Sequence, residues 1–325
     1  MPVKWGILST ARINRLLIAG ARQSPDVEIV AVASRSSSRA ESYALENGIE
    51  RAHGSYEALL SDPEVEVVYI SLPNSMHVEW TVRALEAGKH VLCEKPLSRR
   101  AEAAELAFDT AERQQRVLME AFMYRHNPQT FRLVELVRGG AVGRLGLIRA
   151  AFSFAARDSA NIRLSTELDG GALMDVGCYC VNGARLIGGE PVRVSAEQVS
   201  GGDGVDVVFA ATMRFPGDVV AQFDCGLALA ARDELEVVGE DGSLFLDDPW
   251  HCRVPVIELR REQGVERIEL PVSNSYRLEA ENMSAAVRGE ASALLGRDDA
   301  VGQARAIEAL FEAADSGRGV TLSGR

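Results

Sequence analysis

Three side chains in this sequence carry acid–base chemistry in arrangements that suggest a catalytic site. The first, Lys95, lies between Glu94 and Pro96, and the proline biases the lysine backbone away from helical geometry. The other two, Asp175 and Tyr179, are residues i and i+4, so on an α-helix they share one face. A buried acid and a buried phenol each need a hydrogen-bond partner. These two residues therefore form either a simple hydrogen-bonded pair or an acid–base site facing Lys95.

The first part of the chain alternates two hydrophobic periods, which predicts repeated strand–helix–strand units. Such units form a parallel sheet with helices on both faces, and ligands bind at the carboxyl ends of its strands. Lys95 follows one of these strands and is therefore expected at the ligand-binding edge. The expected strands are Val3–Leu8, Glu28–Ser34, Val67–Leu72, His90–Cys93 and Val117–Glu120, and the expected helices are about Arg12–Gln23, Arg39–Asn47, His77–Ala87 and Arg99–Arg113.

After about Phe122 the pattern changes to a run of alternating strands joined by turns, which predicts an antiparallel sheet. We therefore expect two closely packed domains, 1–122 and 123–325, with a C-terminal helix that can pack back on the first domain. The expected helices are Pro128–Arg138, one that begins at Gly170, Tyr276–Gly289 and Ala300–Ser316, and the expected strands are Leu147–Ala156, Val192–Gln198, Asp206–Phe215, Val219–Leu227, Leu235–Gly239, Ser243–Leu246, Val256–Arg261 and Val265–Leu270.

The turn after the first strand occupies the place of the glycine-rich phosphate loop in nucleotide-binding α/β proteins. The fingerprint G-x-G-x-x-G falls on Ser9, Ala11 and Asn14, none of which is glycine. A helix N-terminus still offers unpaired backbone N–H groups to a pyrophosphate, and small residues leave room for it. The turn is thus either a dinucleotide site built from small residues or a plain strand-to-helix turn. In the first case the cofactor contacts are Ser9, Thr10, Ala11, Arg12 and Ile13.

Ser34, Arg35 and Arg39 follow the second strand, where an NAD enzyme usually carries an acid for the ribose and an NADP enzyme an arginine for the 2′-phosphate. They form either a phosphate clamp or a solvated first helical turn, where arginine gains nothing from the helix dipole. We favour NADP over NAD as the cofactor.

Two further segments offer cofactor contacts at the same edge. The segment SLPNSMH follows a strand, and its Asn74 can hydrogen-bond a ribose or simply cap the next helix. Glu94 and Lys95 follow the neighbouring strand. The expected cofactor contacts here are Leu72, Pro73, Asn74, His77, Glu94 and Lys95.

The bulk properties exclude several classes of protein. A formal net charge of −12 disfavours nucleic acid and anionic membranes as partners. The five cysteines include no C-x-x-C pair, so we expect neither a zinc site nor a disulfide framework, and no other metal site. No apolar run is long enough to cross a bilayer, and the first residues do not resemble a signal peptide. A cytoplasmic protein with a small neutral substrate is expected.

The sequence resembles the Gfo/Idh/MocA oxidoreductase family nearly end to end. The segments that carry the resemblance are WGILSTARIN, SLPNSMH, CEKP, MEAFMYRHNP, GGALMDVGCY and EAADSGRGVTLS. The family lysine matches Lys95 and its helix acid matches Asp175. Many members carry histidine where Tyr179 stands, and tyrosine there, with the Ser34-Arg35 pair, resembles the branch of glucose–fructose oxidoreductase, dimeric dihydrodiol dehydrogenase and NADP-dependent D-xylose dehydrogenases. That branch tolerates loss of the glycine fingerprint.

The resemblance implies an α/β Rossmann domain followed by an α+β domain with a large, mainly antiparallel open sheet. It also implies hydride transfer between a nicotinamide and a carbinol carbon. A phenol in water titrates near about pH 10, and a nearby ammonium favours its ionised form. We expect Tyr179 to exchange the substrate proton, Lys95 to supply positive charge, and Asp175 to position one or both. The rival hypothesis makes Lys95 itself the acid–base group.

The favoured activity is aldose 1-dehydrogenation, on xylose or glucose. The alternatives are a trans-dihydrodiol dehydrogenase or keto-sugar reductase, a non-catalytic NAD(P)-binding regulator, and redox-assisted glycoside hydrolysis. The sequence shows no aromatic cluster in the second domain, which favours sugars over aromatic diols. Arg163 and His126 are candidate substrate contacts. Since a large sheet with an apolar face must be covered, we expect a homodimer or homotetramer formed through the antiparallel sheet.

Overall fold

A computed structural model describes residues 1–158 and 161–322, and the chain divides into two compact units. The division does not follow the chain order, because a late segment returns to the first unit. Unit 1 comprises Met1–Ser98, Glu102–Met123 and Asn274–Val301, and unit 2 comprises Arg99–Ala101, Tyr124–Ser273 and Gly302–Arg325. Within the described residues, no helix is both long enough and apolar enough to cross a membrane.

Unit 1 is built on a parallel sheet whose six described strands follow the order β3-β2-β1-β4-β5-β6. Between β1 and β4 the order reverses, so the carboxyl ends of these two neighbouring strands mark the switch point where such sheets bind ligands. The strands are β1 (Val3–Leu8), β2 (Val27–Ala33), β3 (Arg51–His53), β4 (Val67–Ile70), β5 (His90–Glu94) and β6 (Leu118–Ala121).

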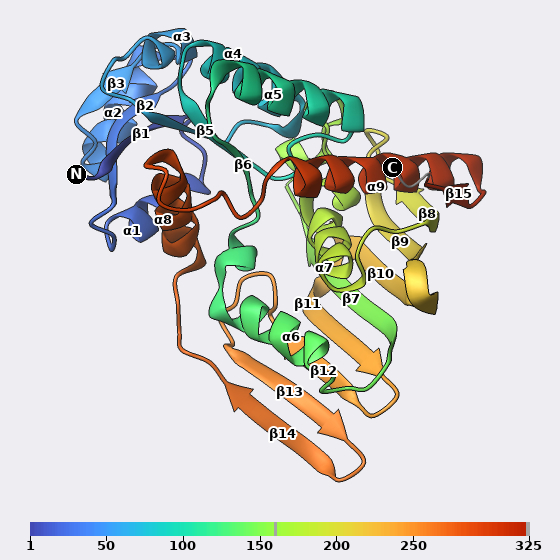
Figure 1. Ribbon diagram of the computed structural model, residues 1–325. Coiled ribbons are helices and arrows are strands. Elements are labelled where there is room, and N and C mark those ends of the chain that lie inside the picture. The colour runs from blue at the N-terminus through green and yellow to red at the C-terminus, as the bar shows by residue number, and fades with distance from the viewer. Residues whose placement is uncertain (159–160, 323–325) are drawn as a thin grey trace. The chain divides into compact units, whose positions relative to one another are not determined.

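Helices cover both faces of this sheet, with α4 and α5 on one face and α1 and α8 on the other (Figure 1). Gly20 on α1 makes the packing of α8 possible, since a Cβ at Gly20 would lie 2.7 Å from the backbone nitrogen of Arg277. The helices are α1 (Asn14–Ala21), α2 (Ser37–Asn47), α3 (Tyr56–Leu60), the 3₁₀ turn η1 (Asn74–Met76), α4 (His77–Glu86), α5 (Ala101–Gln114) and α8 (Ser275–Val287).

Unit 2 is built on a sheet in which the described strands follow the order β14-β13-β12-β11-β7-β10-β9-β8-β15. Neighbours are antiparallel except β7 and β10, which pair in parallel. The strands are β7 (Leu145–Ala155), β8 (Arg193–Ser200), β9 (Asp206–Arg214), β10 (Val220–Gly226), β11 (Ala228–Gly239), β12 (Ser243–Asp247), β13 (Val256–Arg261), β14 (Gly264–Glu269) and β15 (Val320–Thr321).

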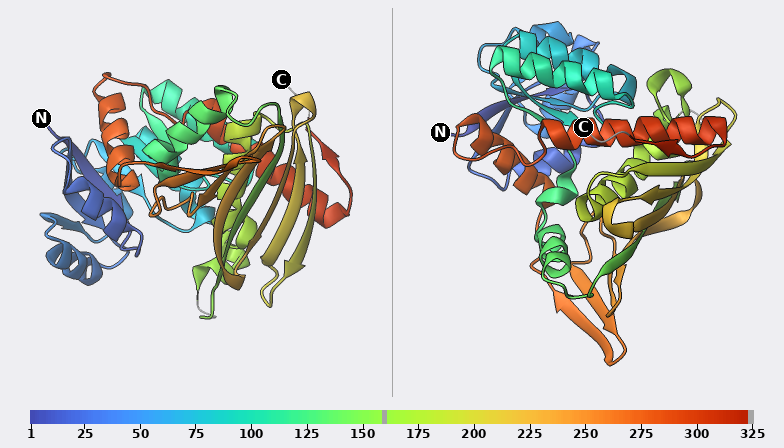
Figure 2. Two further views of the ribbon diagram at one scale, coloured as in Figure 1. Left: turned by 90° about the horizontal axis from the view of Figure 1, so that it is seen from below. Right: turned by 45° about the vertical axis from the view of Figure 1, so that its right-hand side comes forward.

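One face of this sheet packs on helices, and the other carries no helix among the described residues (Figure 2). Phe209 stacks on Phe223 on the helix-covered face and also contacts Phe311 of α9. The helical elements of this part are η2 (Met123–His126), α6 (Pro128–Arg138), the 3₁₀ turns η3 (Ile162–Leu164), η4 (Thr166–Leu168) and η6 (Pro216–Asp218), the π-helix η5 (Leu173–Gly177), α7 (Cys178–Gly188) and α9 (Arg297–Ser316), which continues from unit 1 into unit 2.

The predicted fold class is confirmed: a parallel-sheet α/β domain and an α+β domain with a mainly antiparallel open sheet. The short elements β3, α3 and β15 were not predicted, because segments of two to five residues leave too little pattern to detect. One prediction about the site is wrong in part. Leu173–Gly177 is a π-helix, so α-helical spacing does not hold over the first half of the interval from Asp175 to Tyr179.

Candidate active site

The turn after β1 is held by a buried polar network at the switch point of the sheet. Ser9 Oγ accepts a hydrogen bond from the backbone N–H of Ala11 at 3.1 Å and lies 2.7 Å from Ser71 Oγ at the end of β4. Asn14 joins both strands, because its amide donates to the Ser9 carbonyl at 3.0 Å while its side-chain oxygen accepts from Ser71 Oγ at 2.6 Å. The Ser9 hydroxyl therefore serves the turn itself.

The same turn retains the features that a pyrophosphate requires. Ser9 has φ 145°, a positive value that glycine normally supplies at this point of the fingerprint. No group in the described part of the chain accepts a hydrogen bond from the backbone N–H of Arg12 or Ile13, just before α1 begins. Thr10 and Ala11 are partly exposed and Arg12 is exposed. These residues fit a bound anion through main-chain donors, with no need for the glycines.

The end of β2 presents two exposed arginines. Ser34 is buried, and its N–H donates to the carbonyl of His53 at 3.0 Å. Arg35 and Arg39 lie on either side of the N-cap residue of α2, Ser36. Both guanidinium groups act electrostatically on the same phenol, Tyr56, so each lies near that side chain. Within the described residues neither arginine forms an ion pair, which leaves two positive charges available to a phosphate.

The turn that carries Lys95 is fixed from three neighbouring elements. The Tyr69 hydroxyl on β4 donates to the Glu94 carboxylate, and the pKa of Tyr69 is raised well above its ordinary value by burial and by that charge. The carboxylate of buried Glu120 on β6 accepts the N–H of Leu97 at 2.7 Å. Lys95 itself is partly exposed, and its peptide bond to Pro96 is cis. The lysine backbone is thus held on the carboxyl edge of the sheet.

His77 provides the third contact to this turn. Its ring is 1% exposed, with Nδ1 2.8 Å from the Pro96 carbonyl oxygen and Nε2 2.9 Å from that of Leu72. The ring is therefore placed to tie two loops together rather than to contact a cofactor. Asn74 is the first residue of the 3₁₀ turn before α4, whose N-cap is Pro73, and Met76 is the N-cap residue of α4, so Asn74 occupies neither N-cap position.

In unit 2, Asp175 lies within the π-helix η5 and Tyr179 in the first turn of α7. The N-terminus of η5 is fixed by buried Asp206, whose carboxylate accepts the N–H of Leu173 at 2.7 Å. Burial raises the pKa of Asp206 to about 7. Single π-helical turns inside α-helices are frequent at functional sites. The irregular turn therefore supports a functional role for the acid that it carries.

Tyr179 belongs to a cluster of aromatic rings. Its ring centroid lies 5.9 Å from that of Tyr124, 5.5 Å from that of Phe152 and 6.0 Å from that of Trp250. The expectation that unit 2 lacks an aromatic cluster is therefore wrong. The rings come from four segments far apart in the sequence, so only the folded chain brings them together.

The two expected substrate contacts have different surroundings. Arg163 Nε donates to Asp175 Oδ2 at 2.6 Å, so this arginine contacts the candidate catalytic acid directly. His126 is only 5% exposed at the end of η2, which leaves its ring little surface for a substrate.

Within the described residues, one group of side chains has the geometry to hold a metal ion: Asp233, Asp248 and His251. However, the Arg253 guanidinium contacts Asp248 Oδ1 at 2.7 Å and Oδ2 at 3.0 Å, and a cation in that position repels a metal ion. His251 Nδ1 lies 2.6 Å from Asp233 Oδ2 and 3.2 Å from Asp248 Oδ1. This group is better described as an ion-pair network around a charged imidazole.

The sequence patterns did not reveal the buried polar residues that hold the turns and the helix of the candidate site in place. Tyr69, Ser71, Glu120 and Asp206 lie in or beside apolar strands, and their partners come from other strands or turns. A polar residue in an otherwise apolar strand was the available signal, since such a residue needs a hydrogen-bond partner when buried.

Two family models match the chain. The model described as "Oxidoreductase family, NAD-binding Rossmann fold" matches residues 3–122, and the model described as "GFO/IDH/MocA C-terminal domain" matches residues 131–245. The matched ranges include the Lys95 turn in the first domain and the Asp175 and Tyr179 segment in the second. These side chains thus lie within family domains.

Named relatives are similar over most of the chain. D-xylose 1-dehydrogenase (NADP(+)) 2 from Haloferax volcanii is 37% identical over 98% of this chain and 99% of the relative. Trans-1,2-dihydrobenzene-1,2-diol dehydrogenase from Danio rerio is 33% identical over 85% of this chain and 82% of the relative. The solved structure of a 3-ketoreductase from Actinomadura kijaniata, in complex with NADP and TDP-benzene, is 30% identical with a TM-score of 0.91, over 96% of this chain and 98% of that one. The protein is therefore an oxidoreductase of the Gfo/Idh/MocA family.

Proposed function

We propose that the protein is an NADP-dependent oxidoreductase that transfers hydride between the nicotinamide and a hydroxyl or carbonyl group of a sugar-like substrate. The favoured reaction is oxidation of an aldose, such as xylose or glucose, at C1. The observation that carries the proposal is the fixed position of Lys95 on the ligand-binding edge of the parallel sheet. Three separate contacts, from Tyr69, His77 and Glu120, hold the turn of that single lysine, which indicates that its position matters.

The preference for NADP rests on Arg35 and Arg39. They follow β2, where the ribose 2′-position of a dinucleotide lies in this fold class, and two arginines suit a 2′-phosphate better than a neutral hydroxyl. When bound, NADP accepts or supplies the hydride. The pyrophosphate is assigned to the main-chain donors from Ser9 to Ile13, and the ribose and nicotinamide to the loops at Leu72–Asn74 and Glu94–Lys95. The NADP named for the Haloferax dehydrogenase and the Actinomadura ketoreductase supports this choice.

The proton leaves or joins the substrate hydroxyl through Tyr179 in this proposal. Lys95 supplies positive charge that favours the phenolate and orients the hydroxyl, and Asp175 positions its neighbours. The rival assignment makes Lys95 the proton-transfer group. Turnover by Tyr179→Phe separates the two assignments. Loss of turnover with retained NADP binding supports the tyrosine, whereas unchanged turnover removes it from this role.

The direct test is a spectrophotometric screen that follows reduced nicotinamide. The purified protein is assayed with NADP and with NAD against aldoses, polyols and trans-dihydrodiols, and in the reverse direction against keto-sugars. NADP-linked oxidation of an aldose, lost in Lys95→Ala, is the expected result. Absence of turnover on the whole panel, with NADP still bound tightly, favours the non-catalytic regulator instead. Tight copurification of NAD without net turnover favours redox-assisted glycoside hydrolysis.

A trans-dihydrodiol dehydrogenase is the second candidate, and the aromatic cluster around Tyr179 favours it specifically. Buried rings from Tyr124, Phe152 and Trp250 make the surroundings of Tyr179 apolar, which suits an aromatic diol better than a sugar. This candidate is supported if kcat/KM for a trans-dihydrodiol exceeds kcat/KM for every aldose tested. The keto-sugar reductase alternative is tested by the reverse assay, in which reduction of a keto-sugar would support it.

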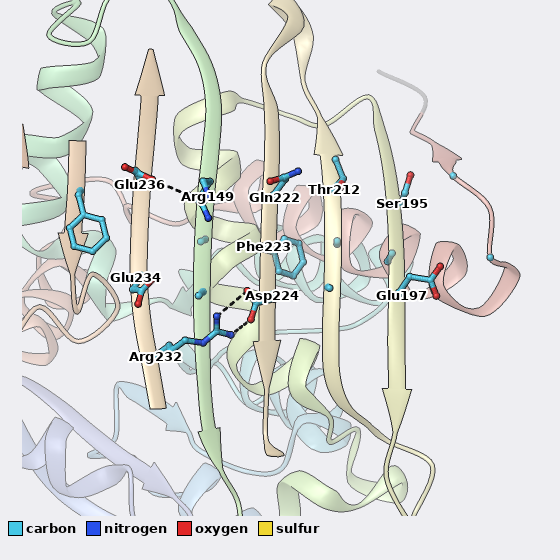
Figure 3. A pocket seen from close by; sticks show the side chains of 18 of the residues that line it. Arg149, Ser195, Glu197, Thr212, Gln222, Phe223, Asp224, Arg232, Glu234 and Glu236 are labelled. Carbon is cyan, nitrogen blue, oxygen red and sulfur yellow. Dashed lines mark hydrogen bonds and ion pairs between the residues drawn. The ribbon is translucent and has the colours of Figure 1, made fainter. Parts of the chain in front are cut away.

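We also propose that the protein forms a homodimer or homotetramer through the open face of the unit 2 sheet, in the cytoplasm. This face carries a shallow hollow of about 800 Å³ lined by small residues and charged pairs (Figure 3). Arg149 contacts Glu236 at 3.5 Å, and Arg232 contacts Asp224. Since these charges are already paired, a second sheet can cover them without leaving an unpaired ion. The cysteines are free thiols, which suits a reducing compartment.

A further inference from the structure

We infer that Arg163 is a positioning residue that fixes the carboxylate of Asp175 for catalysis, instead of binding substrate itself. The inference rests on the proposed function, because it assigns a role within the same site. Arg163 Nε donates to Asp175 Oδ2 at 2.6 Å, which is a short charge-assisted hydrogen bond. The two residues are separated by twelve positions in the chain, so the contact is formed by the loop between β7 and η5.

The main chain of Arg163 is anchored to the segment that carries Asp175. Its carbonyl oxygen accepts the N–H of Gly171 at 2.8 Å, and its own N–H donates to Asn161 Oδ1 at 3.2 Å. Gly170 permits this approach, because a Cβ there would lie 2.4 Å from the Arg163 carbonyl oxygen. The backbone of Arg163 in η3 is therefore anchored beside the start of the segment that carries Asp175 in η5.

The exposed fractions of the two side chains indicate that the ion pair positions Asp175 and adds little to the stability of the fold. The Arg163 side chain is 43% exposed and that of Asp175 is 16% exposed. An ion pair with one partner this accessible to water contributes little to folding stability. What it does provide is a direction, since the bond fixes the orientation of the Asp175 carboxylate. Loss of the arginine should thus affect turnover more than the fold.

The main experiment compares steady-state kinetics of the wild type with Arg163→Ala, Arg163→Lys and Arg157→Ala. Arg157 is exposed on the same loop and forms no ion pair within the described residues, so it is the matched control. Arg163→Ala should lower kcat by about tenfold or more while KM for the substrate changes by less than about threefold. Arg163→Lys should lose less, and added ethylguanidine should restore part of the turnover of Arg163→Ala. Arg157→Ala should match the wild type.

A rise in KM alone would show that Arg163 binds substrate, and unchanged kinetics would show that it has no role; either result overturns the inference. So does failure of guanidine rescue in a variant that binds NADP normally. A second readout needs no turnover: the Nε–H resonance of Arg163 in selectively labelled protein should exchange slowly with solvent in the wild type and rapidly in Asp175→Asn. If that resonance behaves as expected and no substrate is turned over, the proposed function fails while the pairing stands.

Discussion

His77 Nδ1 lies 2.8 Å from the carbonyl oxygen of Pro96, so a buried imidazole holds the residue that follows Lys95. The other ring nitrogen lies 2.9 Å from the Leu72 carbonyl oxygen. The ring thus joins the loops after β4 and β5, which are the two loops assigned to the nicotinamide side of the cofactor.

We predict that His77→Leu lowers both stability and turnover. The leucine leaves two buried carbonyl oxygens without this partner, and the free energy of unfolding should fall by about 1–3 kcal/mol. The freed Lys95 turn should lower kcat by about tenfold. Urea unfolding and steady-state kinetics measure the two effects.

His90→Leu is the matched control for that variant. His90 lies at the opposite end of β5 from Lys95, and its Nδ1 accepts the N–H of Val117 at 2.9 Å. Its replacement also removes a hydrogen bond from unit 1, so stability should fall while kcat stays near the wild-type value. An equal loss of kcat in both variants would mean that the Lys95 turn does not depend on His77 in particular.

We predict that Arg35→Ser raises KM for NADP and leaves KM for NAD nearly unchanged. A charged hydrogen bond to phosphate contributes about 1.5–3 kcal/mol, which corresponds to a rise in KM of about 10- to 150-fold. Arg39→Ser should act in the same direction. Arg113→Ala, which removes an exposed arginine from α5, should change neither constant. A parallel rise in KM for both cofactors would show that Arg35 does not recognise the 2′-phosphate.

The architecture could be predicted from the sequence because its long elements have clear periodicity. The limits of β1, α6 and β13 agree with the sequence patterns at both ends. The π-helix at Leu173–Gly177 could not be predicted, because its apolar residues fit an α-helical pattern equally well. The π-helix also depends on tertiary contacts that the local sequence does not show, such as the hydrogen bond from the Leu173 N–H to the Asp206 carboxylate.

For the candidate site, the sequence suggested which chemical groups take part but gave no sign of the residues that hold them in place. Lys95 was expected on the sheet edge because Pro96 and the preceding strand are visible in the sequence. The contact from Arg163 to Asp175 was not expected, because a loop arginine has no periodicity and its partner follows twelve residues later. Long-range contacts of this kind depend on how the loop between β7 and η5 folds back.

We predict that Asp206 makes the protein less stable as pH rises through about 7. Burial raises the pKa of this carboxyl from its usual 3.8 to about 7, so the folded state favours the protonated form more than the unfolded state does. The stabilisation is fully present below pH 3.8 and is lost as the pH rises through about 7. Between these values the free energy of unfolding should fall by at most about 1.4 kcal/mol per pH unit for this group.

Urea unfolding of the wild type and of Asp206→Asn across that range measures the effect. The asparagine keeps a side-chain oxygen for the Leu173 N–H but does not titrate, so its pH dependence should be weaker. Since Arg99 lies near Asp206 and lowers its pKa, Arg99→Ala should extend the loss of stability to higher pH and make the total loss larger. Identical pH dependence in the wild type and Asp206→Asn would show that this carboxyl titrates outside the range.

We predict a pH dependence of the same sign around His251, with loss of stability at a more alkaline pH. Burial alone would lower its pKa, but hydrogen bonds to Asp233 and Asp248 outweigh burial and raise the pKa to about 9. A histidine with a raised pKa stabilises the fold fully below its ordinary value of 6.5, and this contribution is lost as the pH rises through about 9. His251→Gln should remove the dependence between these values in thermal unfolding. A divalent cation should not replace the effect, because Arg253 occupies the Asp248 carboxylate.

We predict that a single arginine on the open face of the unit 2 sheet disrupts self-association. Ala210 on β9 lines the hollow, and its small, exposed side chain allows a second sheet to approach. In a twofold interface each substitution occurs twice, so Ala210→Arg introduces two bulky charges without added partners. Light scattering should show a monomer for this variant.

Leu106→Arg is the control, because Leu106 is an exposed residue of α5 in unit 1, and this variant should keep the wild-type mass. A wild-type monomer at micromolar concentration, or an unchanged oligomer in Ala210→Arg, would exclude this face as the interface.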